Sequence, residues 1–346
     1  MKANVLYGVG DLRFVDVALP RCKEGEVLVK VRAAGICGSD VARVFTTGTY
    51  HFPTIIGHEF AGEVVETRDA RHRHLSGKRV AVFPLKPCFT CCNCKEGKYE
   101  LCLDYDYIGS RCDGGFAEYV AVPVWNLLCV PDSISMEAAA MLEPASVAMH
   151  ALIRSRMRIG DAVAVIGPGT IGMILCRLAM IAGAKDVFLI GRSQEKLDFA
   201  VKYGIRNVCD SSVDDVKEWI DSLTGHKGVD IAVEGTGASS SMNLALDVVK
   251  STGTILALGN PLDDMLLQKK AYWKILRKQL SLYGTWNSSY GTGRSDWTQV
   301  LDLLEKGRID LEKLITHRLP LSELSKGLDI MKDKNTYSNK VMIINE

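Results

Sequence analysis

The chain has 346 residues, of which 47% are hydrophobic and 24% charged, with a formal net charge of +1. This ordinary globular composition allows two domains. A charge so close to neutrality offers no broad basic field, which argues against nucleic acid or an anionic membrane surface as a partner. Residues 1–20 are interrupted by charges, and the longest uncharged apolar run, 162–176, is too short and too rich in Gly and Pro to span a membrane. We expect a cytoplasmic protein without a signal peptide.

The first part of the chain reads as a β-rich domain, beginning with the alternating run Glu26–Arg32. Two glycine-rich turns follow, and they hold Cys37 and His58. A thiolate and an imidazole are two of the three protein ligands that a catalytic zinc commonly uses, and Asp40 is a candidate acceptor for the His58 ring N–H. Cys37 alone also fits a buried small apolar residue. The glycines around both residues suit close backbone approach and favour the metal site.

Four of the eleven cysteines crowd into seven positions, which in a large chain argues for metal ligands over a disulfide framework. A C-x2-C-x2-C-x7-C arrangement is formed by Cys88, Cys91, Cys94 and Cys102. Four thiolates can enclose one tetrahedral ion with no open position, so this predicted zinc site is structural. Cys92 is an alternative ligand. The segment is not basic, so a nucleic-acid-binding zinc module has little support.

The turn at 109–119 carries Arg111, the one cation here with an obvious chance of meeting a substrate anion. A solvated loop arginine is an equally good interpretation. Residues 136–141 then predict a helix with Ser133 or Ser135 as its cap. We expect this helix to end before Pro144, where the backbone would leave helical geometry and turn the carboxylate of Glu143 into a cleft.

The next segment has the pattern of a dinucleotide-binding turn. An apolar run at 162–166 leads into three glycines and a helix start, comprising Gly167, Gly169, Thr170, Ile171 and Gly172. In such a strand–turn–helix unit, the glycines allow the tight turn and the approach of a pyrophosphate to the helix N-terminus. Further strands at 187–190, 229–233 and 254–258 alternate with helical patterns, as expected for a parallel doubly wound sheet.

The end of the second strand of this unit bears on the choice of nicotinamide cofactor. An NAD enzyme normally places an acidic residue there, whereas this chain has Gly191, followed by Arg192, Ser193 and, at the start of a helix, Lys196. An arginine can pair with a 2′-phosphate, so NADP is favoured. Alternatively, Arg192 stacks on the adenine and NAD binds.

The last part of the chain contains a strand at 280–286, helices near 296–306 and 321–332, and a closing strand at 340–344. The closing strand is expected to rejoin the first domain. We therefore predict three segments: a catalytic domain at 1–148, a nucleotide-binding domain at 149–286, and a return to the catalytic domain at 287–346.

The chain resembles the zinc-dependent medium-chain dehydrogenases over its whole length, within their polyol dehydrogenase branch. The motifs that carry this resemblance are Gly35–Asp40, Gly57–Gly62, the four-cysteine segment, Leu142–Pro144 and Gly167–Gly172. More narrowly, Pro87–Cys91, Asp104–Arg111 and Asp113–Tyr119 are similar to dehydrogenases of this branch that act on galactitol 1-phosphate.

The resemblance implies a GroES-like β-rich catalytic domain and a Rossmann domain. It also implies a catalytic zinc on Cys37, His58 and Glu143, with Glu59 exchanging as a ligand or acting behind the ligands. Ser39 resembles the family's hydroxyl relay, although a turn-forming serine is the alternative. Zinc would lower the pKa of a bound secondary alcohol, whose carbon passes hydride to the nicotinamide.

The implied reaction interconverts a polyol phosphate and a ketose phosphate with NAD(P), and it needs two zinc ions per chain, one catalytic and one structural. Alternatives are a sorbitol/L-iditol-type enzyme on free polyols, a ribitol-5-phosphate dehydrogenase and a threonine dehydrogenase. A nucleotide-binding protein without turnover is the alternative outside enzymes. The family also suggests a homodimer or homotetramer.

Overall fold

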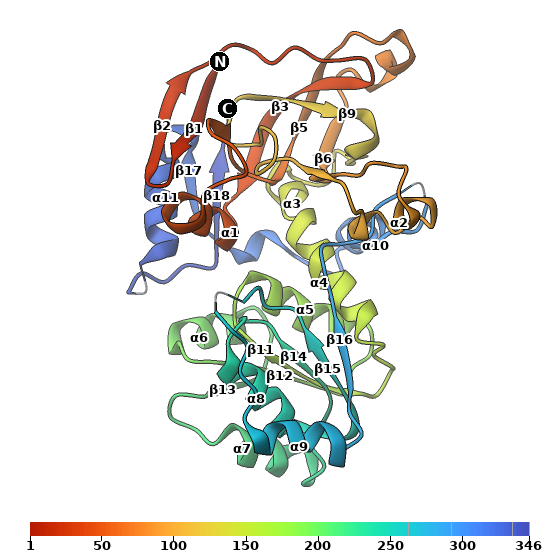
Figure 1. Cartoon of the computed structure of the whole chain (residues 1–346), viewed down its shortest axis with the longest axis vertical. Coiled ribbons are helices and arrows are strands. Elements are labelled where there is room, and N and C mark those ends of the chain that lie inside the picture. The colour runs from red at the N-terminus through yellow and green to blue at the C-terminus, as the bar shows by residue number, and fades with distance from the viewer. Residues whose placement is uncertain (262, 292, 334, 346) are drawn as a thin grey trace. The chain divides into compact units, whose positions relative to one another are not determined.

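A computed structural model describes residues 1–261, 263–291, 293–333 and 335–345. The chain divides into two compact units, one formed by Met1–Pro144 with Ser289–Glu346 and the other by Ala145–Ser288. The first unit therefore contains both ends of the chain, as the red and blue segments of Figure 1 show. Each unit has its own sheet and its own core.

The first unit is built on a seven-stranded sheet in the order β10-β6-β5-β3-β18-β17, with β9 also paired to β3. Only β17 and β18 pair in parallel. The strands are β3 (Glu26–Gly35), β5 (Glu59–Thr67), β6 (Arg79–Val82), β9 (Tyr119–Pro123), β10 (Leu127–Cys129), β17 (Ile315–Pro320) and β18 (Lys340–Ile344). The predicted closing strand has its expected bounds, and it pairs with β3 from the start of the chain.

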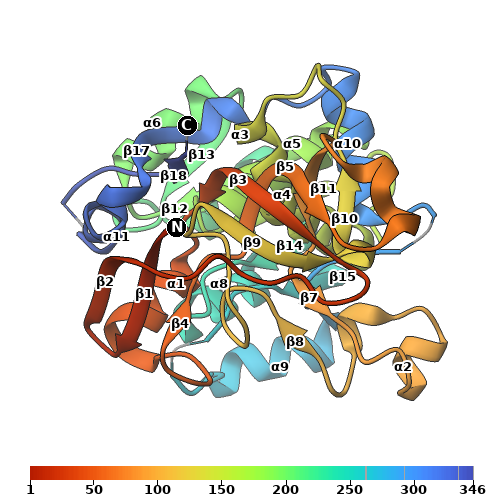
Figure 2. The ribbon, with the colours of Figure 1, turned by 90° about the horizontal axis from the view of Figure 1, so that it is seen from above.

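Apolar alternation explains why this sheet forms a core. Val27, Val29 and Val31 of β3 are all fully buried in one cluster with residues of β5, β6, β9 and β18. Two smaller sheets complete the strands of this unit, and Figures 1 and 2 show β1 and β2 side by side at its edge. Their strands are β1 (Lys2–Gly8), β2 (Asp11–Asp16) and β4 (Thr54–Ile55) in one sheet, and β7 (Leu85–Lys86) and β8 (Asp106–Tyr107) in the other.

The α-helices of the first unit are short. They are α1 (Gly38–Ala42), α2 (Cys92–Lys95), α3 (Met136–Ala140), α10 (Asp296–Glu305) and α11 (Leu324–Lys332), and α4 (Leu142–Arg154) begins here and continues into the second unit. A π-helical turn follows α1 at Arg43–Thr47, and 3-10 turns lie at Ala70–Leu75, Tyr99–Leu101, Val124–Asn126, Glu312–Leu314 and Leu321–Glu323.

The second unit is a six-stranded parallel sheet in the order β13-β12-β11-β14-β15-β16. Its strands are β11 (Ala162–Ile166), β12 (Asp186–Gly191), β13 (Asn207–Asp210), β14 (Val229–Glu234), β15 (Val249–Ala257) and β16 (Ser281–Gly284). The helices are α5 (Thr170–Ile181), α6 (Gln194–Lys202), α7 (Val216–Thr224), α8 (Ser239–Val248) and α9 (Lys269–Arg277). Figure 1 shows α5 and α6 on one face of the sheet and α7, α8 and α9 on the other.

This strand order is that of a Rossmann fold, in which the first and fourth strands of the unit meet at a switch point. Both faces of β11 are covered, and all five of its residues are buried. The predicted fold class, a GroES-like β-rich domain with a Rossmann domain, is confirmed. None of the helices in the described part of the chain has both the length and the apolarity to cross a membrane.

One local prediction was wrong. The helix α3 does end before Pro144, at Ala140, but Glu143 does not leave helical geometry: Glu143 and Pro144 lie in the first turn of the next helix, α4. Proline is tolerated there because the backbone N–H groups of a first helical turn need no partner within the helix. Ser135, and not Ser133, caps α3, its side chain accepting a hydrogen bond from the N–H of Ala138.

Candidate active site

Three potential metal ligands converge where β3 and β5 run side by side. Cys37 lies two residues after the end of β3. His58 directly precedes β5, and Glu59, the first residue of β5, pairs with Gly35. One ligand atom of each residue, a thiol sulfur, a ring nitrogen and a carboxylate oxygen, lies within 4.8 Å of the other two. Gly35 leaves room for the carboxylate of Glu59, because a Cβ atom at position 35 would lie 2.3 Å from Glu59 Oε2 and displace it.

Asp40 contacts two of these three potential ligands, Cys37 and His58, through its carboxylate oxygens. It is fully buried; its Oδ2 accepts a hydrogen bond from the N–H of Cys37 at 3.0 Å, and its Oδ1 lies 3.3 Å from His58 Nδ1 and 2.9 Å from the guanidinium of Arg43. Burial acts to raise the pKa of Asp40, but His58 and Arg43 outweigh it and lower that pKa. The ionised carboxylate can therefore orient the imidazole of His58 toward the other ligands.

Glu143 lies close to this cluster but outside the group of three ligand atoms. It is buried, and its Oε1 accepts a hydrogen bond from the hydroxyl of Tyr107 at 3.4 Å. Burial raises the pKa of Glu143 to about 7, with His58 opposing and Glu59 adding to that rise. Of the two carboxylates considered from the sequence, the structure places Glu59 with Cys37 and His58. The ligand role of Glu143 stays a prediction.

Sequence reasoning missed Lys340. Its ammonium group is buried at the start of β18 and contacts Glu59 Oε2 at 2.5 Å and the carbonyl oxygen of Ile36 at 3.1 Å. Glu59 is thus the anionic half of a buried ion pair. The partners are 281 positions apart in sequence. A lysine at the start of an apolar strand is typical of an exposed strand end, so the local pattern gave no signal.

The predicted cysteine site is assembled in the loop from β7 to the 3-10 turn at Tyr99–Leu101. The four sulfurs of Cys88, Cys91, Cys94 and Cys102 lie within 4.8 Å of one another. The N–H groups of Cys88 and Cys91 point at sulfurs of the same cluster, with donor–acceptor distances of 3.2 and 3.4 Å. Cys92 is exposed and lies outside this group.

Two further predicted site residues have defined partners. Ser39, in α1, accepts a hydrogen bond on its Oγ from the guanidinium of Arg43 at 3.0 Å. Arg111 lies between two tyrosine rings, with its guanidinium carbon 4.1 Å from the ring centroid of Tyr50 and 4.4 Å from that of Tyr105. Neither side chain is a loose surface group.

In the second unit, the glycine-rich turn has the geometry that its sequence predicts. Gly167 has a φ of +123°, and a Cβ atom at Gly172 would lie 2.1 Å from the carbonyl oxygen of Gly167. Gly169 is the N-cap residue of α5, and Thr170 and Ile171 are the first two residues of that helix. This is the arrangement in which a helix N-terminus receives a phosphate group.

The residues predicted to select the cofactor lie at the end of β12. Arg192 is exposed, and Ser193 caps α6 by accepting a hydrogen bond from the N–H of Lys196 at 3.5 Å. A Cβ atom at Gly191 would lie 2.5 Å from Pro168 Cγ. The glycine therefore also has a steric reason to be there.

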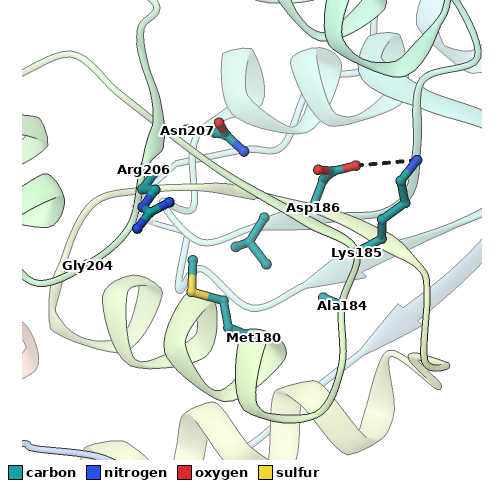
Figure 3. Close-up of a pocket in the computed structure, with 8 residues that line it drawn as sticks. Met180, Ala184, Lys185, Asp186, Gly204, Arg206 and Asn207 are labelled. Atoms are coloured by element: carbon teal, nitrogen blue, oxygen red, sulfur yellow. Dashed lines mark ion pairs between the residues drawn. The ribbon is translucent and has the colours of Figure 1, made fainter.

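A surface pocket of about 320 Å³ in the second unit is a separate feature. Figure 3 shows Met180, Arg206 and Asn207 around it, with Lys185 and Asp186 forming an ion pair at 3.8 Å. The pocket lies where β12 and β13 begin. Ligands of open parallel sheets bind at the carboxyl ends of the strands, so this pocket is not the predicted nucleotide site.

Comparisons with known proteins agree with this architecture. The profile of the alcohol dehydrogenase GroES-like domain matches residues 23–132, and that of the zinc-binding dehydrogenases matches residues 170–306. Galactitol 1-phosphate 5-dehydrogenase of Escherichia coli K12 is 33% identical, with 99% of this chain and 100% of that protein aligned. The chain belongs to the zinc-dependent medium-chain dehydrogenases.

Other members differ in the substrate that they are named for. Sorbitol dehydrogenase of Bombyx mori is 32% identical over 95% of both chains, and D-arabitol-phosphate dehydrogenase of Enterococcus avium is 30% identical over 97% of this chain and 94% of its own. Membership of this family makes the chain an oxidoreductase that acts as a polyol or alcohol dehydrogenase. The predicted resemblance and the predicted enzyme class are thereby confirmed.

Solved structures of family members match the whole chain. The crystal structure of galactitol-1-phosphate dehydrogenase from Escherichia coli has a TM-score of 0.92 at 33% identity and covers both chains completely. A zinc-binding dehydrogenase from Sinorhizobium meliloti 1021, bound to NADP, has a TM-score of 0.91 at 30% identity and covers 99% of both chains.

Proposed function

We propose that this dehydrogenase interconverts a polyol phosphate resembling galactitol 1-phosphate and the corresponding ketose phosphate, with NAD(P) as hydride carrier. The observation that carries the proposal is the convergence of Cys37, His58 and a buried carboxylate beside Asp40. The galactitol 1-phosphate and D-arabitol-phosphate enzymes among its relatives support a phosphorylated substrate.

The donor set at this site fits a zinc ion. A thiol sulfur, an imidazole and a carboxylate are its ordinary protein ligands, and Asp40, with Oδ1 3.3 Å from His58 Nδ1, can hold the imidazole in place for the ion. Cys37, His58 and Glu143 would hold the ion, with Glu59 exchanging for Glu143 or staying paired to Lys340. When bound, zinc supplies Lewis-acid polarisation of the substrate oxygen.

The protein's own groups then have defined tasks. Asp40 fixes the orientation of His58, and Arg43 holds both Asp40 and Ser39. Because Ser39 Oγ accepts a hydrogen bond from a cation, its orientation is fixed, and it receives the proton of the substrate alcohol and passes it toward solvent. The turn at Gly167–Gly172 would hold the pyrophosphate of the dinucleotide cofactor, whose nicotinamide ring would supply the hydride acceptor when bound.

The second proposed zinc ion belongs to the four-cysteine cluster. Four converging sulfurs, two of which accept N–H groups of their own loop, fit a closed tetrahedral site. Such a site has no position for substrate, so its role is structural. Two zinc ions per chain are therefore expected by elemental analysis of the purified protein.

NADP is the proposed preferred cofactor, supported by Arg192 and by the absence of an acidic side chain at Gly191. The test compares kcat/KM with NADP and NAD for Gly191→Asp and for Gly191→Ala. Both variants place a Cβ atom against Pro168, so only the carboxylate distinguishes them. A shift toward NAD in Gly191→Asp alone supports the proposal, and an unchanged ratio in both variants overturns it.

The enzyme is also proposed to be a cytoplasmic homodimer or homotetramer. Within the described residues, β16 pairs only with β15 and forms one edge of its sheet. Leu282 on that strand and Trp286 just after it are 46% and 53% exposed. An apolar sheet edge is suited to pairing with a second copy. Sedimentation of Leu282→Glu beside the unmodified protein tests this: monomers only in the variant support it, and an unchanged assembly opposes it.

The decisive experiment for function is steady-state oxidation of galactitol 1-phosphate beside galactitol, sorbitol, ribitol 5-phosphate and threonine, each with NAD and with NADP. A large kcat/KM advantage for a phosphorylated polyol supports the proposal. The second candidate, a sorbitol-type dehydrogenase, is favoured by the Bombyx mori relative and predicts that free polyols match or exceed their phosphates.

A further inference from the structure

Arg111 is a cation that the fold holds rigidly without neutralising it. Its guanidinium is stacked between Tyr50 and Tyr105 and donates one hydrogen bond, at 3.2 Å, to the carbonyl oxygen of Tyr105. No carboxylate in the described part of the chain forms an ion pair with it, and its buried Nε makes no hydrogen bond. The site therefore offers a fixed positive charge that no carboxylate among the described residues neutralises.

The backbone around Arg111 is held by two separate segments. The N–H of Arg111 donates to the carbonyl oxygen of Tyr107 at 2.8 Å, and its own carbonyl oxygen lies 3.1 Å from His51 Nε2. The N–H of Tyr50 reaches the carbonyl oxygen of Ser110 at 3.4 Å. Because the loop and both flanking rings are in place beforehand, an anion that binds there orders few groups.

A row of aromatic rings connects this cation with the proposed metal ligands. The ring centroids of Tyr105 and Tyr107 are 6.4 Å apart, and those of Tyr107 and His58 are 5.8 Å apart. Tyr107 also donates to Glu143. At the other end of the row, Tyr50 is 69% exposed, so the outer side of Arg111 can be reached from solvent.

We propose that Tyr50, Arg111 and Tyr105 form the site that binds the phosphate group of the substrate. The inference rests on the proposed function and deepens it, because it names the residues that distinguish a phosphorylated polyol from a free one. A guanidinium attracts phosphate oxygens and donates N–H groups to them. Since Nε of Arg111 is buried and Nη1 donates to the carbonyl oxygen of Tyr105, the terminal N–H groups on the other side of the guanidinium are the donors for the phosphate. A phosphate monoester carries a charge of about −1.5 to −2 at neutral pH, and the positive charge of Arg111 attracts it and neutralises part of it.

The test measures kcat/KM for the phosphorylated polyol that wild-type enzyme oxidises best and for the same polyol without phosphate. Arg111→Gln is expected to lower the value for the phosphorylated substrate by about 10- to 100-fold, the usual worth of a charge-assisted hydrogen bond, while the free polyol stays within about twofold. Arg111→Lys, which keeps the charge but not the fork, is expected to fall between the two. Equal loss on both substrates, or none, overturns the inference.

Arg177→Gln is the matched control. Arg177 is also partly buried, and its guanidinium carbon lies 5.9 Å from the ring centroid of a tyrosine, Tyr203. The variant loses the same charge, but in the other unit. It is expected to retain the wild-type preference. A loss of preference equal to that of Arg111→Gln would show a general charge effect and overturn the assignment.

The substrate preferences of the wild-type enzyme and of Arg111→Gln separate failure of this inference from failure of the proposed function, and inhibition by inorganic phosphate tests the site independently. Wild-type enzyme that prefers the phosphorylated polyol, with Arg111→Gln keeping that preference, refutes only the site. Wild-type enzyme that prefers the free polyol refutes the proposed substrate and the inference together. Competitive inhibition by inorganic phosphate that Arg111→Gln weakens at least tenfold supports the site, and inhibition that is unchanged in this variant opposes it.

Discussion

Replacing Lys340 with methionine tests whether the buried ion pair beside the active site is a structural necessity. Lys340 is 3% exposed, and its ammonium group has two partners, the carboxylate of Glu59 and the carbonyl oxygen of Ile36. Methionine has a similar length and fills the space, but it leaves Glu59 as an uncompensated buried charge. The variant is therefore expected to be destabilised much more than by a change in packing alone.

The expected magnitude follows from the burial of both partners. Removing one member of a buried pair raises the free energy of the folded state by about 3–5 kcal/mol. Burial acts to lower the pKa of Lys340, but Glu59 outweighs it and raises that pKa above its usual 10.5. A raised pKa means that the stabilisation is complete below pH 10.5 and is lost only as pH rises through the folded-state value. The charge of Lys340 itself is therefore constant between pH 6 and pH 8. Because Lys340 also lowers the pKa of Glu143, any difference in the loss between these two pH values should come from Glu143.

Native-state hydrogen exchange is the assay, because it measures the two units in one sample. Amides of β18 and β3 should open with a free energy lower by about 3–5 kcal/mol in Lys340→Met, while those of β11, in the other unit, should stay unchanged. The double variant Glu59→Gln with Lys340→Met removes both charges and should recover at least half of the loss. A loss below about 1 kcal/mol, or a double variant as unstable as the single one, would refute the reasoning.

Three further results are expected. Cys94→Ser should lower the zinc content from two ions to one by elemental analysis, whereas the exposed Cys92→Ser should keep both; equal zinc loss would contradict the assigned cluster. Burial raises the pKa of Glu143 from 4.5 to about 7, so the folded zinc-free protein keeps a proton that the unfolded chain releases. Its stability should therefore fall by about 3 kcal/mol between pH 4.5 and pH 8 through this group, and Glu143→Gln should abolish that part of the decline in urea unfolding. Arg192→Gln should lower the NADP to NAD ratio of kcat/KM by about tenfold; an unchanged ratio would exclude Arg192 from cofactor selection.

The sequence predicted those parts of the molecule whose pattern is local. The glycines at 167, 169 and 172 follow an apolar strand and precede a helix, and the structure has β11, the turn and α5 at those positions. The cysteine spacing likewise predicted a cluster whose four sulfurs the loop brings together. In both cases the residues that must meet are close in sequence, so spacing alone constrains the geometry.

Long-range pairing limited the prediction at the active site. Asp40 and His58 lie near each other, as their residue types suggested, with Asp40 Oδ1 3.3 Å from His58 Nδ1, but the choice between Glu59 and Glu143 depends on how β3, β5 and α4 come together. The ion pair with Lys340 requires β18 to lie beside β3, which no local pattern in the last strand reveals. Pro144 led to a wrong local prediction for Glu143. The residue before a proline usually leaves helical geometry, but a proline is tolerated in a first helical turn, and that is where α4 places both residues.

Gly191 shows why the reason for a residue is harder to predict than its position. From the sequence, the glycine was interpreted by what it lacks, an acidic group that would repel a 2′-phosphate. In the structure, Pro168 from the glycine-rich turn occupies the space where any side chain at position 191 would begin. The steric explanation requires glycine, whereas the cofactor explanation requires only a residue without an acidic group, so the glycine satisfies both and its presence cannot separate them. Arg192 has no such steric role, since it is exposed, and the proposed preference for NADP therefore depends on its charge more directly than on the glycine before it.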